Sequence, residues 1–239
     1  MSNTTTAPTP TRPAFSMPLI EASPDEIYDI ELEHSLLEAN ARLAEKNRAL
    51  LDQYGITAID FMGAIGSGKT TLIARLVEKL KDRAGVAVFN GDATTSDDAQ
   101  AVAAFGVPVV QIATVNGCHL DANLVGKALG KIDLKGLRLL FLENIGNLIC
   151  PAEFPLGAKA RVVVISVTEG PWMVRKHPHM FLGAQIVVIN KIDLAAAMNV
   201  SVDALTQDVH TLKPDIQVFA TSCRTGAGLD QVADALLAI

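Results

Sequence analysis

Residues 63–71 read "GAIGSGKTT", and this stretch decides the fold. It satisfies the pattern G-x-x-x-x-G-K-[ST] and lies between an apolar run and a helical run, which is typical of a phosphate-binding loop. The glycines let backbone N–H groups close around phosphate oxygens, and the helix that follows adds its dipole. Lys69 would neutralise the β- and γ-phosphates, and the Thr70 hydroxyl would bind Mg²⁺. The predicted nucleotide-binding residues here are Gly63, Gly66, Ser67, Gly68, Lys69, Thr70 and Thr71.

Apolar runs and helical patterns alternate along the rest of the chain. Runs rich in Val, Ile and Leu, such as 86–91, 107–113 and 160–167, indicate strands buried on both faces. Amphipathic stretches such as 70–83 and 202–213 indicate helices. Strands that alternate with helices predict an α/β fold with a mostly parallel sheet, and ligands of such sheets bind beyond the carboxyl ends of the strands.

The sequence divides into three parts. Residues 1–22 are rich in Thr and Pro and predict a disordered tail, and 56–239 form the predicted P-loop domain. Between them, residues 23–55 predict an N-terminal helical segment, since Ser23 followed by Glu26 fits a capping box. Two roles stay open for this segment, because the same amphipathic pattern suits docking on the core and assembly with a second chain.

Composition excludes several classes of protein. The chain has 239 residues with 49% hydrophobic and 19% charged residues, which predicts a packed globular core. Its net charge of −6 disfavours nucleic-acid binding, which requires a basic face. We find no apolar run of the roughly 20 residues that a membrane span needs and no signal-peptide pattern, so a cytoplasmic location is expected. Three cysteines, an odd and sparse number, fit a reducing compartment.

A second nucleotide motif indicates guanine. Residues 187–194 read "VVINKIDL", and Asn190, Lys191 and Asp193 match the pattern N-K-x-D at the end of a predicted strand. The carboxylate of Asp193 can accept hydrogen bonds from the N1–H and the 2-amino group of guanine, a pair of donors that adenine lacks. Asn190 would steady the base pocket, and the stem of Lys191 would lie along the ring.

A further loop completes the predicted base pocket. Residues 221–226 read "TSCRTG", and the backbone of Ser222 and Cys223 is expected near the guanine O6 atom. We expect the thiol of Cys223 to have a structural role rather than to bind a metal.

Two acidic segments follow predicted strands on the switch side of the sheet. Asp92 lies in "NGDATTSDDA" (90–99), and Glu143 begins a D-x-x-G-like motif in which glutamate replaces aspartate and Gly146 would contact the γ-phosphate. One carboxylate should hold Mg²⁺ together with Thr70, and one should position the attacking water; the pattern leaves open which does which. The predicted catalytic residues are Lys69, Asp92 and Glu143. No glutamine follows the motif to orient water, so slow intrinsic hydrolysis is expected.

A cysteine–histidine pair offers a separate kind of chemistry. Cys118 and His119 follow the predicted strand 107–113, and Cys150 lies seven residues after Glu143. Thiolate and imidazole suit Zn²⁺ or Ni²⁺, but a closed structural site usually has four ligands. Three ligands in one chain fit a metal-transfer site or a site completed across a dimer axis. A chance dipeptide is the alternative.

Together these motifs resemble the HypB family, GTPases that help to insert nickel into [NiFe]-hydrogenase. The resemblance covers about residues 30–239. Its most specific elements are "CHLDA" and "ENIGNLICP", and "SVTEG" and "PHMF" also match. The N-terminal C-x-x-C-G-C motif of some members is absent from this sequence, so high-affinity nickel storage is not expected.

The resemblance implies more than the motifs show alone. It implies a P-loop fold of the dimerising class that includes nitrogenase iron protein and signal-recognition GTPases, and a GTP-dependent homodimer with the metal at the subunit interface. It implies Cys118, His119 and Cys150 as ligands, and hydrogenase-maturation proteins and the hydrogenase large subunit as partners. A urease-type nickel GTPase would carry C-P-H in place of "CHLDA", and a non-enzymatic metal-binding scaffold would not need intact nucleotide motifs.

Overall fold

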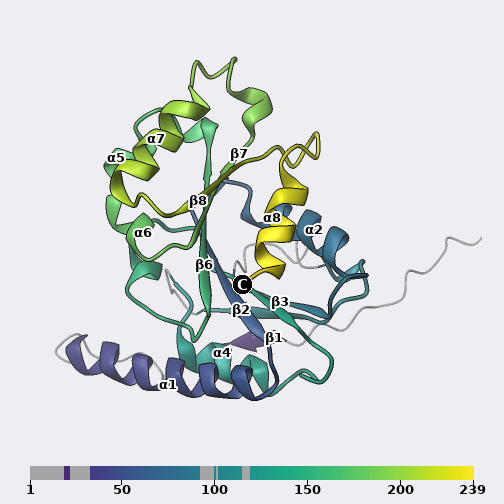
Figure 1. The fold of residues 1–239 in the computed structure, drawn as a ribbon. Coiled ribbons are helices and arrows are strands. Elements are labelled where there is room, and N and C mark those ends of the chain that lie inside the picture. The colour runs from purple at the N-terminus through teal and green to yellow at the C-terminus, as the bar shows by residue number, and fades with distance from the viewer. Residues whose placement is uncertain (1–18, 22–32, 92–99, 101, 115–118) are drawn as a thin grey trace, which may run out of the picture.

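Eight parallel strands form one sheet (Figure 1). The computed structural model describes residues 19–21, 33–91, 100, 102–114 and 119–239. The strand order is β1-β4-β3-β5-β2-β6-β7-β8, and every neighbouring pair is parallel. The strands are Leu19–Glu21 (β1), Thr57–Met62 (β2), Val86–Asn90 (β3), Val109–Ala113 (β4), Leu139–Glu143 (β5), Ala160–Ser166 (β6), Ile186–Asn190 (β7) and Gln217–Ala220 (β8).

Helices cover both faces of this sheet. The α-helices are Glu33–Gln53 (α1), Lys69–Leu80 (α2), Ala122–Leu129 (α4), Met173–Lys176 (α5), Pro178–Leu182 (α6), Val202–Leu212 (α7) and Leu229–Leu237 (α8). Short 3₁₀ turns are Cys150–Ala152 (η3), Val167–Glu169 (η4) and Ile192–Leu194 (η5). Helices α2 and α8 pack on one face, and α4 to α7 pack on the other, with α1 lying across α4 (Figure 1).

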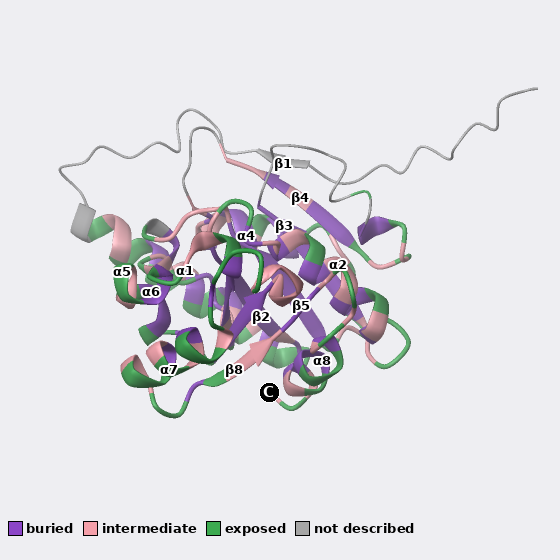
Figure 2. Cartoon of the chain, turned by 90° about the horizontal axis from the view of Figure 1, so that it is seen from above, coloured by how far each residue is buried: buried purple, intermediate pink, exposed green. Residues whose placement is uncertain are grey.

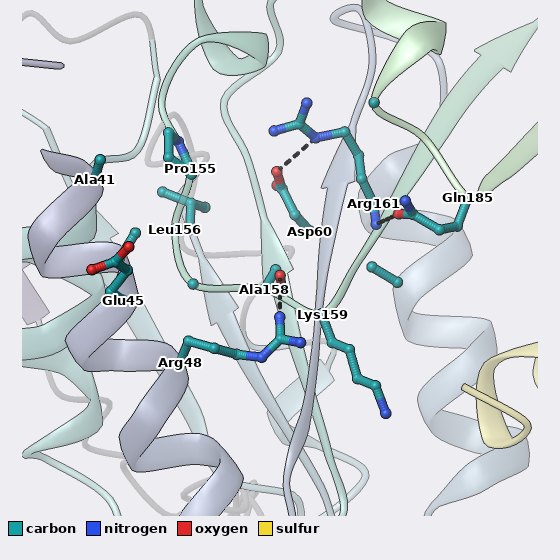
Figure 3. A pocket seen from close by; sticks show the side chains of 14 residues that line it. Ala41, Glu45, Arg48, Asp60, Pro155, Leu156, Ala158, Lys159, Arg161 and Gln185 are labelled. Atoms are coloured by element: carbon teal, nitrogen blue, oxygen red, sulfur yellow. Dashed lines mark hydrogen bonds and ion pairs between the residues drawn. The ribbon is translucent and has the colours of Figure 1, made fainter. Parts of the chain in front are cut away.

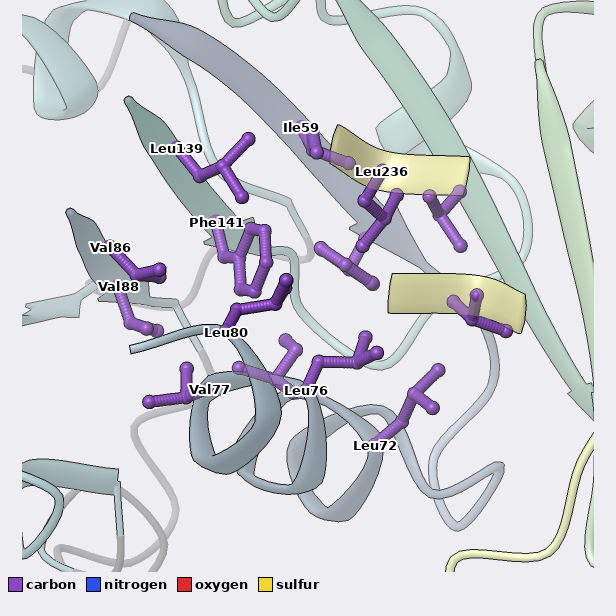
Figure 4. Packing of buried hydrophobic residues seen from close by; sticks show 14 of the residues in the cluster. Ile59, Leu72, Leu76, Val77, Leu80, Val86, Val88, Leu139, Phe141 and Leu236 are labelled. Carbon is purple, nitrogen blue, oxygen red and sulfur yellow. The ribbon is translucent and has the colours of Figure 1, made fainter. Parts of the chain in front are cut away.

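Alternate residues of each strand pack against the helices on opposite faces of the sheet. Ile59 and Phe61 of β2 pack with Leu76 of α2 and Leu236 of α8 in one cluster, as Figure 4 illustrates. Ala58, which directly precedes Ile59, faces the opposite side, where α1 and α4 lie. The purple strands at the centre of Figure 2 are therefore buried from both sides. This explains why the strands read as continuous apolar runs rather than as alternating ones.

The two predicted N-terminal parts have mixed outcomes. Residues 19–21 lie within the predicted tail, yet they form β1, which pairs with β4 and is itself the edge strand of the sheet. An edge strand offers unpaired backbone N–H and C=O groups, and three extended residues suffice to use some of them. The rest of 1–22 lies outside the described residues. Helix α1, Glu33–Gln53, lies inside the predicted segment 23–55, and the predicted cap at Ser23 lies outside the described residues.

The α/β fold with a mostly parallel sheet is confirmed.

The chain has 17 glycines and one tryptophan. That tryptophan, Trp172, directly precedes α5, and 55% of its surface is exposed. The guanidinium of Arg175 lies over its ring, 5.1 Å from the centroid. Among the described helices, none combines the length and apolar character needed to cross a membrane.

Candidate functional site

The phosphate loop follows the central strand β2 and enters α2 at Lys69. Gly63 has φ 152°, and a Cβ there would lie 2.1 Å from the Val164 carbonyl oxygen of β6, so this position requires glycine. The Lys69 Nζ atom donates to the carbonyl oxygens of Gly63 and Ala64, at 3.1 Å each. The lysine is 4% exposed, so its charge is held inside the loop where phosphate oxygens would arrive.

The predicted Mg²⁺ residues Thr70 and Glu143 are in direct contact. The Thr70 hydroxyl donates to Glu143 Oε1 at 2.5 Å, and Glu143 is 1% exposed at the end of β5. A hydroxyl and a buried carboxylate are oxygen donors of the kind that Mg²⁺ prefers, so the residues present fit this ion. The third predicted member, Asp92, lies outside the described residues.

The switch-like loop after β5 lies against the phosphate loop. Gly63 and Asn147 form an isolated antiparallel bridge. A Cβ on Gly146 would lie 2.4 Å from a side-chain carbon of Ile65. The predicted γ-phosphate contact Gly146 is therefore placed beside the loop that would hold the phosphates.

The N-K-x-D residues connect the predicted base pocket to the phosphate loop. Asn190 donates from Nδ2 to the Ser67 carbonyl at 3.1 Å and accepts from the Thr221 hydroxyl at 3.2 Å. Lys191 has φ 62°, and its Nζ donates to the Gly66 carbonyl at 2.6 Å. A Cβ on Gly68 would lie 2.5 Å from Asn190 Nδ2, so the close approach of the two loops requires glycine.

The carboxylate of Asp193 is held by the loop after β8. Ser222 donates from its hydroxyl to Asp193 Oδ1 at 2.6 Å, and Arg224 Nε lies 2.9 Å from Oδ2. The hydrogen bond from Ser222 lowers the pKa of Asp193, and Arg224 lowers it further, so the group is ionised as a base acceptor must be. The thiol of Cys223 donates to Asn190 Oδ1 at 3.4 Å, and burial raises its pKa, which agrees with a structural role.

The predicted metal ligands lie on two segments that meet through an aromatic contact. The His119 ring stacks on Phe154, with centroids 3.8 Å apart and an interplanar angle of 23°. Phe154 follows η3, which begins at Cys150, so the two segments are neighbours. Cys118 lies outside the described residues, and only the backbone of Cys150 is described. Within those described residues, no group of three potential ligands gathers.

The surroundings of His119 favour the neutral ring that binds metals. Burial lowers its pKa, and the charges of Asp121 and Glu153 raise it by less. Asp121 caps α4, and its Oδ1 accepts from the Leu124 N–H at 2.9 Å. Its contribution to His119 is therefore an electrostatic one.

Glu169 is a site residue that the sequence motifs did not assign. It lies in η4, after β6, and its Oε1 accepts from the Ser166 N–H at 2.8 Å. Its Oε2 is buried and has no hydrogen-bond partner in the part of the chain that the structure describes. Burial raises the pKa of Glu169 to about 7, and the charges of Lys69 and Lys191 oppose this. The signal available was "SVTEG", which matched as a motif without a role.

The Glu169→Gln variant is expected to remove a pH-dependent loss of stability. Since the folded pKa of about 7 lies above the ordinary value of 4.5, ionisation destabilises the folded state progressively as pH rises between these values. Glutamine keeps the acceptor for Ser166 and stays neutral. Thermal unfolding without nucleotide should show a variant-minus-wild-type difference in Tm that grows from pH 5 to pH 8. A constant difference would contradict the buried, neutral state of Glu169 near pH 6.

Comparison with known proteins points to one group. The family profile described as "CobW/HypB/UreG, nucleotide-binding domain" matches residues 57–220. A probable hydrogenase maturation factor HypB of Methanocaldococcus jannaschii is 46% identical over 205 residues, which is 86% of this chain and 93% of the relative. Helix α1 lies before the matched range.

Solved structures agree in fold. HypB from Archaeoglobus fulgidus superimposes with a TM-score of 0.80 at 40% identity, covering 84% of this chain and 98% of that one. HypB from Helicobacter pylori, in complex with nickel, superimposes with a TM-score of 0.79 at 33% identity, covering 84% and 94%. Two structures that share the parallel sheet thus also share a substantial part of the sequence.

Proposed function

Because the chain belongs to the HypB hydrogenase maturation factors of the CobW/HypB/UreG family, we propose that it is a GTP-hydrolysing metallochaperone that delivers nickel to [NiFe]-hydrogenase. The observation that carries the proposal is the shared edge of the sheet. The phosphate loop, the Asp193 pocket and the segment of His119 all follow the carboxyl ends of parallel strands. Nucleotide and metal would therefore bind on adjoining loops.

In this proposal the chain's own residues position the triphosphate for hydrolysis. Lys69 moves its ammonium from the loop carbonyls to the β- and γ-phosphates, and Gly146 donates its backbone N–H to the γ-phosphate. Thr70 and Glu143, with Asp92, would hold Mg²⁺, which when bound would supply charge neutralisation. Water attacks the γ-phosphorus, the bond to the β-phosphate oxygen breaks, and GDP and phosphate are released. Without a glutamine to orient that water, the intrinsic rate is slow.

Nickel is the cargo of the proposed reaction cycle, and Zn²⁺ is an alternative occupant. Cys118, His119 and Cys150 supply three ligands per chain, and a GTP-bound homodimer would bring two such sets to one interface. The stacking of His119 on Phe154 supports this, since it brings the two ligand-bearing segments together within one chain. The donor and acceptor proteins are those of hydrogenase maturation, and the proposed location is the cytoplasm.

Replacing Cys118 with Ala is expected to abolish nickel binding and to leave GTP binding intact, because the thiolate belongs to the metal site alone. Nickel stoichiometry and GTP affinity, each measured by titration, check both halves of this statement. The Cys223→Ala variant is the matched control, since Cys223 lies in the proposed base pocket and its replacement should leave the nickel stoichiometry unchanged. Equal nickel binding by the wild type and the Cys118 variant would contradict the proposed site.

A turnover assay distinguishes the enzyme from a scaffold. The wild-type chain with Mg²⁺ and GTP should release phosphate slowly but measurably, and analogue-bound chain should be dimeric. A monomer without turnover in every nucleotide state would favour a non-enzymatic metal-binding protein.

A further inference from the structure

Asn144 links two loops through a single side-chain oxygen. The nucleotide loop contains Ile145 and Gly146, and the metal loop contains His119 and Leu120. The residue is fully buried at the end of β5. Its Oδ1 accepts from the N–H of Leu120 and from the N–H of Ile145, at 3.0 Å each. Leu120 follows the candidate ligand His119, and Ile145 precedes the candidate γ-phosphate contact Gly146. One atom is therefore shared by both functional loops.

The amide nitrogen of the same side chain is anchored in the core. Asn144 Nδ2 donates to Asp60 Oδ1 at 3.2 Å, and Asp60 Oδ2 lies 3.4 Å from Arg161 Nε. Figure 3 shows Arg161 directed at Asp60 beside a cavity of about 440 Å³. Asp60 is 2% exposed, and burial raises its pKa against the opposing charge of Arg161. A buried carboxylate in this place makes a different orientation of the asparagine costly.

Helix α1 holds the other end of the metal loop with two more buried asparagines. Asn40 Oδ1 accepts from the Ala122 N–H at 2.8 Å, and its Nδ2 donates to the Pro155 carbonyl at 2.9 Å. Asn47 Nδ2 donates to the carbonyls of Ala122 at 2.7 Å and Leu156 at 3.2 Å. Both side chains thus join the segment after His119 to the segment after Cys150, and their hydrogen bonds within the described residues involve no predicted nucleotide residue.

We propose that Asn144 is the positioning residue through which the nucleotide state acts on nickel affinity, while Asn40 and Asn47 hold the metal loop on α1 independently of the nucleotide. This rests on the proposed function, in which GTP and nickel are coupled. Two N–H donors share one acceptor oxygen, so a shift of Ile145 toward a γ-phosphate must move or weaken the bond to Leu120. The metal loop of His119 is then held at two places. The hydrogen bond from Leu120 to Asn144 responds to nucleotide, and the hydrogen bonds of Asn40 and Asn47 do not.

The test compares nickel affinity in two nucleotide states. The full chain is titrated with Ni²⁺ in the presence of a non-hydrolysable GTP analogue and of GDP, and the ratio of the two affinities is the readout. Wild-type protein should show a ratio of about fivefold or more, as ordinary couplings do. In Asn144→Ala the ratio should fall to about one while both nucleotides still bind. In Asn40→Ala nickel affinity should fall by the same factor in both states, so its ratio is retained.

Arg42→Ala is the matched control on α1. Arg42 is exposed and pairs with Glu38 one turn away, and the variant should keep both the affinity and the ratio of the wild type. An Asn144→Ala variant that keeps the wild-type ratio overturns the proposal. So does an Asn40→Ala variant that loses the ratio, because α1 would then carry the coupling.

Two outcomes need separate readings. If wild-type protein has the same nickel affinity in both nucleotide states, the coupling within the proposed function fails. If the two affinities differ in wild-type protein and differ equally in Asn144→Ala, only the role of Asn144 fails. Should Asn144→Ala not fold, the exchanged pair Asp60→Asn with Asn144→Asp replaces it, since the new carboxylate keeps the acceptor for Leu120 and Ile145. This variant should retain the ratio, and its loss with both ligands still bound overturns the proposal.

Discussion

Replacing Asp193 with Asn is expected to lower GTP affinity by at least about a hundredfold, because a site built for hydrogen bonds discriminates strongly when one is mismatched. The carboxylate offers two acceptors to the N1–H and 2-amino group of guanine. The asparagine amide would set its own N–H donors against one of these donors. Xanthine carries a carbonyl in place of the 2-amino group of guanine, and this carbonyl can accept from the asparagine amide. The variant should therefore bind XTP better than GTP.

Competition between GTP and XTP measures this change of preference. The Ser222→Ala variant is the control, since it removes the hydroxyl donor to Asp193 and leaves the carboxylate in place. It should weaken GTP binding only by a few-fold, as loss of one neutral hydrogen bond does, and should not favour XTP. An unchanged preference for guanine in Asp193→Asn would refute the assignment of the base pocket.

Replacing Lys69 with Ala is expected to reduce GTP turnover by about a hundredfold to a thousandfold, the usual effect of removing one preorganised group that stabilises developing charge. The lysine is buried against the carbonyls of Gly63 and Ala64, so its charge lies inside the loop that would hold the phosphates. Phosphate release under saturating GTP and Mg²⁺ is the measurement.

Lys81→Ala tests whether the loss of a lysine charge at the other end of α2 would give the same effect. Lys81 directly follows α2, and its ammonium pairs with Asp82 at the surface. Its loss should leave turnover within about twofold, since surface ion pairs contribute little. Nickel binding by the Lys69 variant in the absence of nucleotide should match the wild type, which shows that the fold is retained. Full turnover in Lys69→Ala would exclude the phosphate-loop mechanism.

The sheet and its main helices could be predicted from the sequence. Strands buried on both faces are continuous apolar runs, and the longer helices have a periodic apolar pattern. Strands such as β6 and β7 are runs of Val and Ile, and the phosphate loop marks where β2 ends. The short helices α5 and α6, of four and five residues, carry too few turns for a periodic pattern. Strand β1 was missed because its three residues stand in a Thr- and Pro-rich stretch.

Candidate site residues could be predicted where they belong to a known sequence motif. They could not be predicted where a side chain outside any motif hydrogen-bonds to the backbone of a distant segment. Asn40 and Asn47 read as surface polar residues, although their spacing with Ala44 and Leu51 places all four on the buried face of α1. Asp60, a charge inside an apolar strand, was a signal of the same kind. Their partners are carbonyl and N–H groups distant in sequence, and these leave no trace in local composition.

The place of Trp172 makes the chain its own optical reporter. As the sole indole, it stands three residues beyond Glu169, the carboxylate on which the charge of Lys69 acts. Its ring is partly in water and partly under the Arg175 guanidinium, an arrangement in which small displacements alter quenching. Emission from this one indole is therefore expected to respond to nucleotide binding without any attached dye, in stopped-flow experiments as well as at equilibrium.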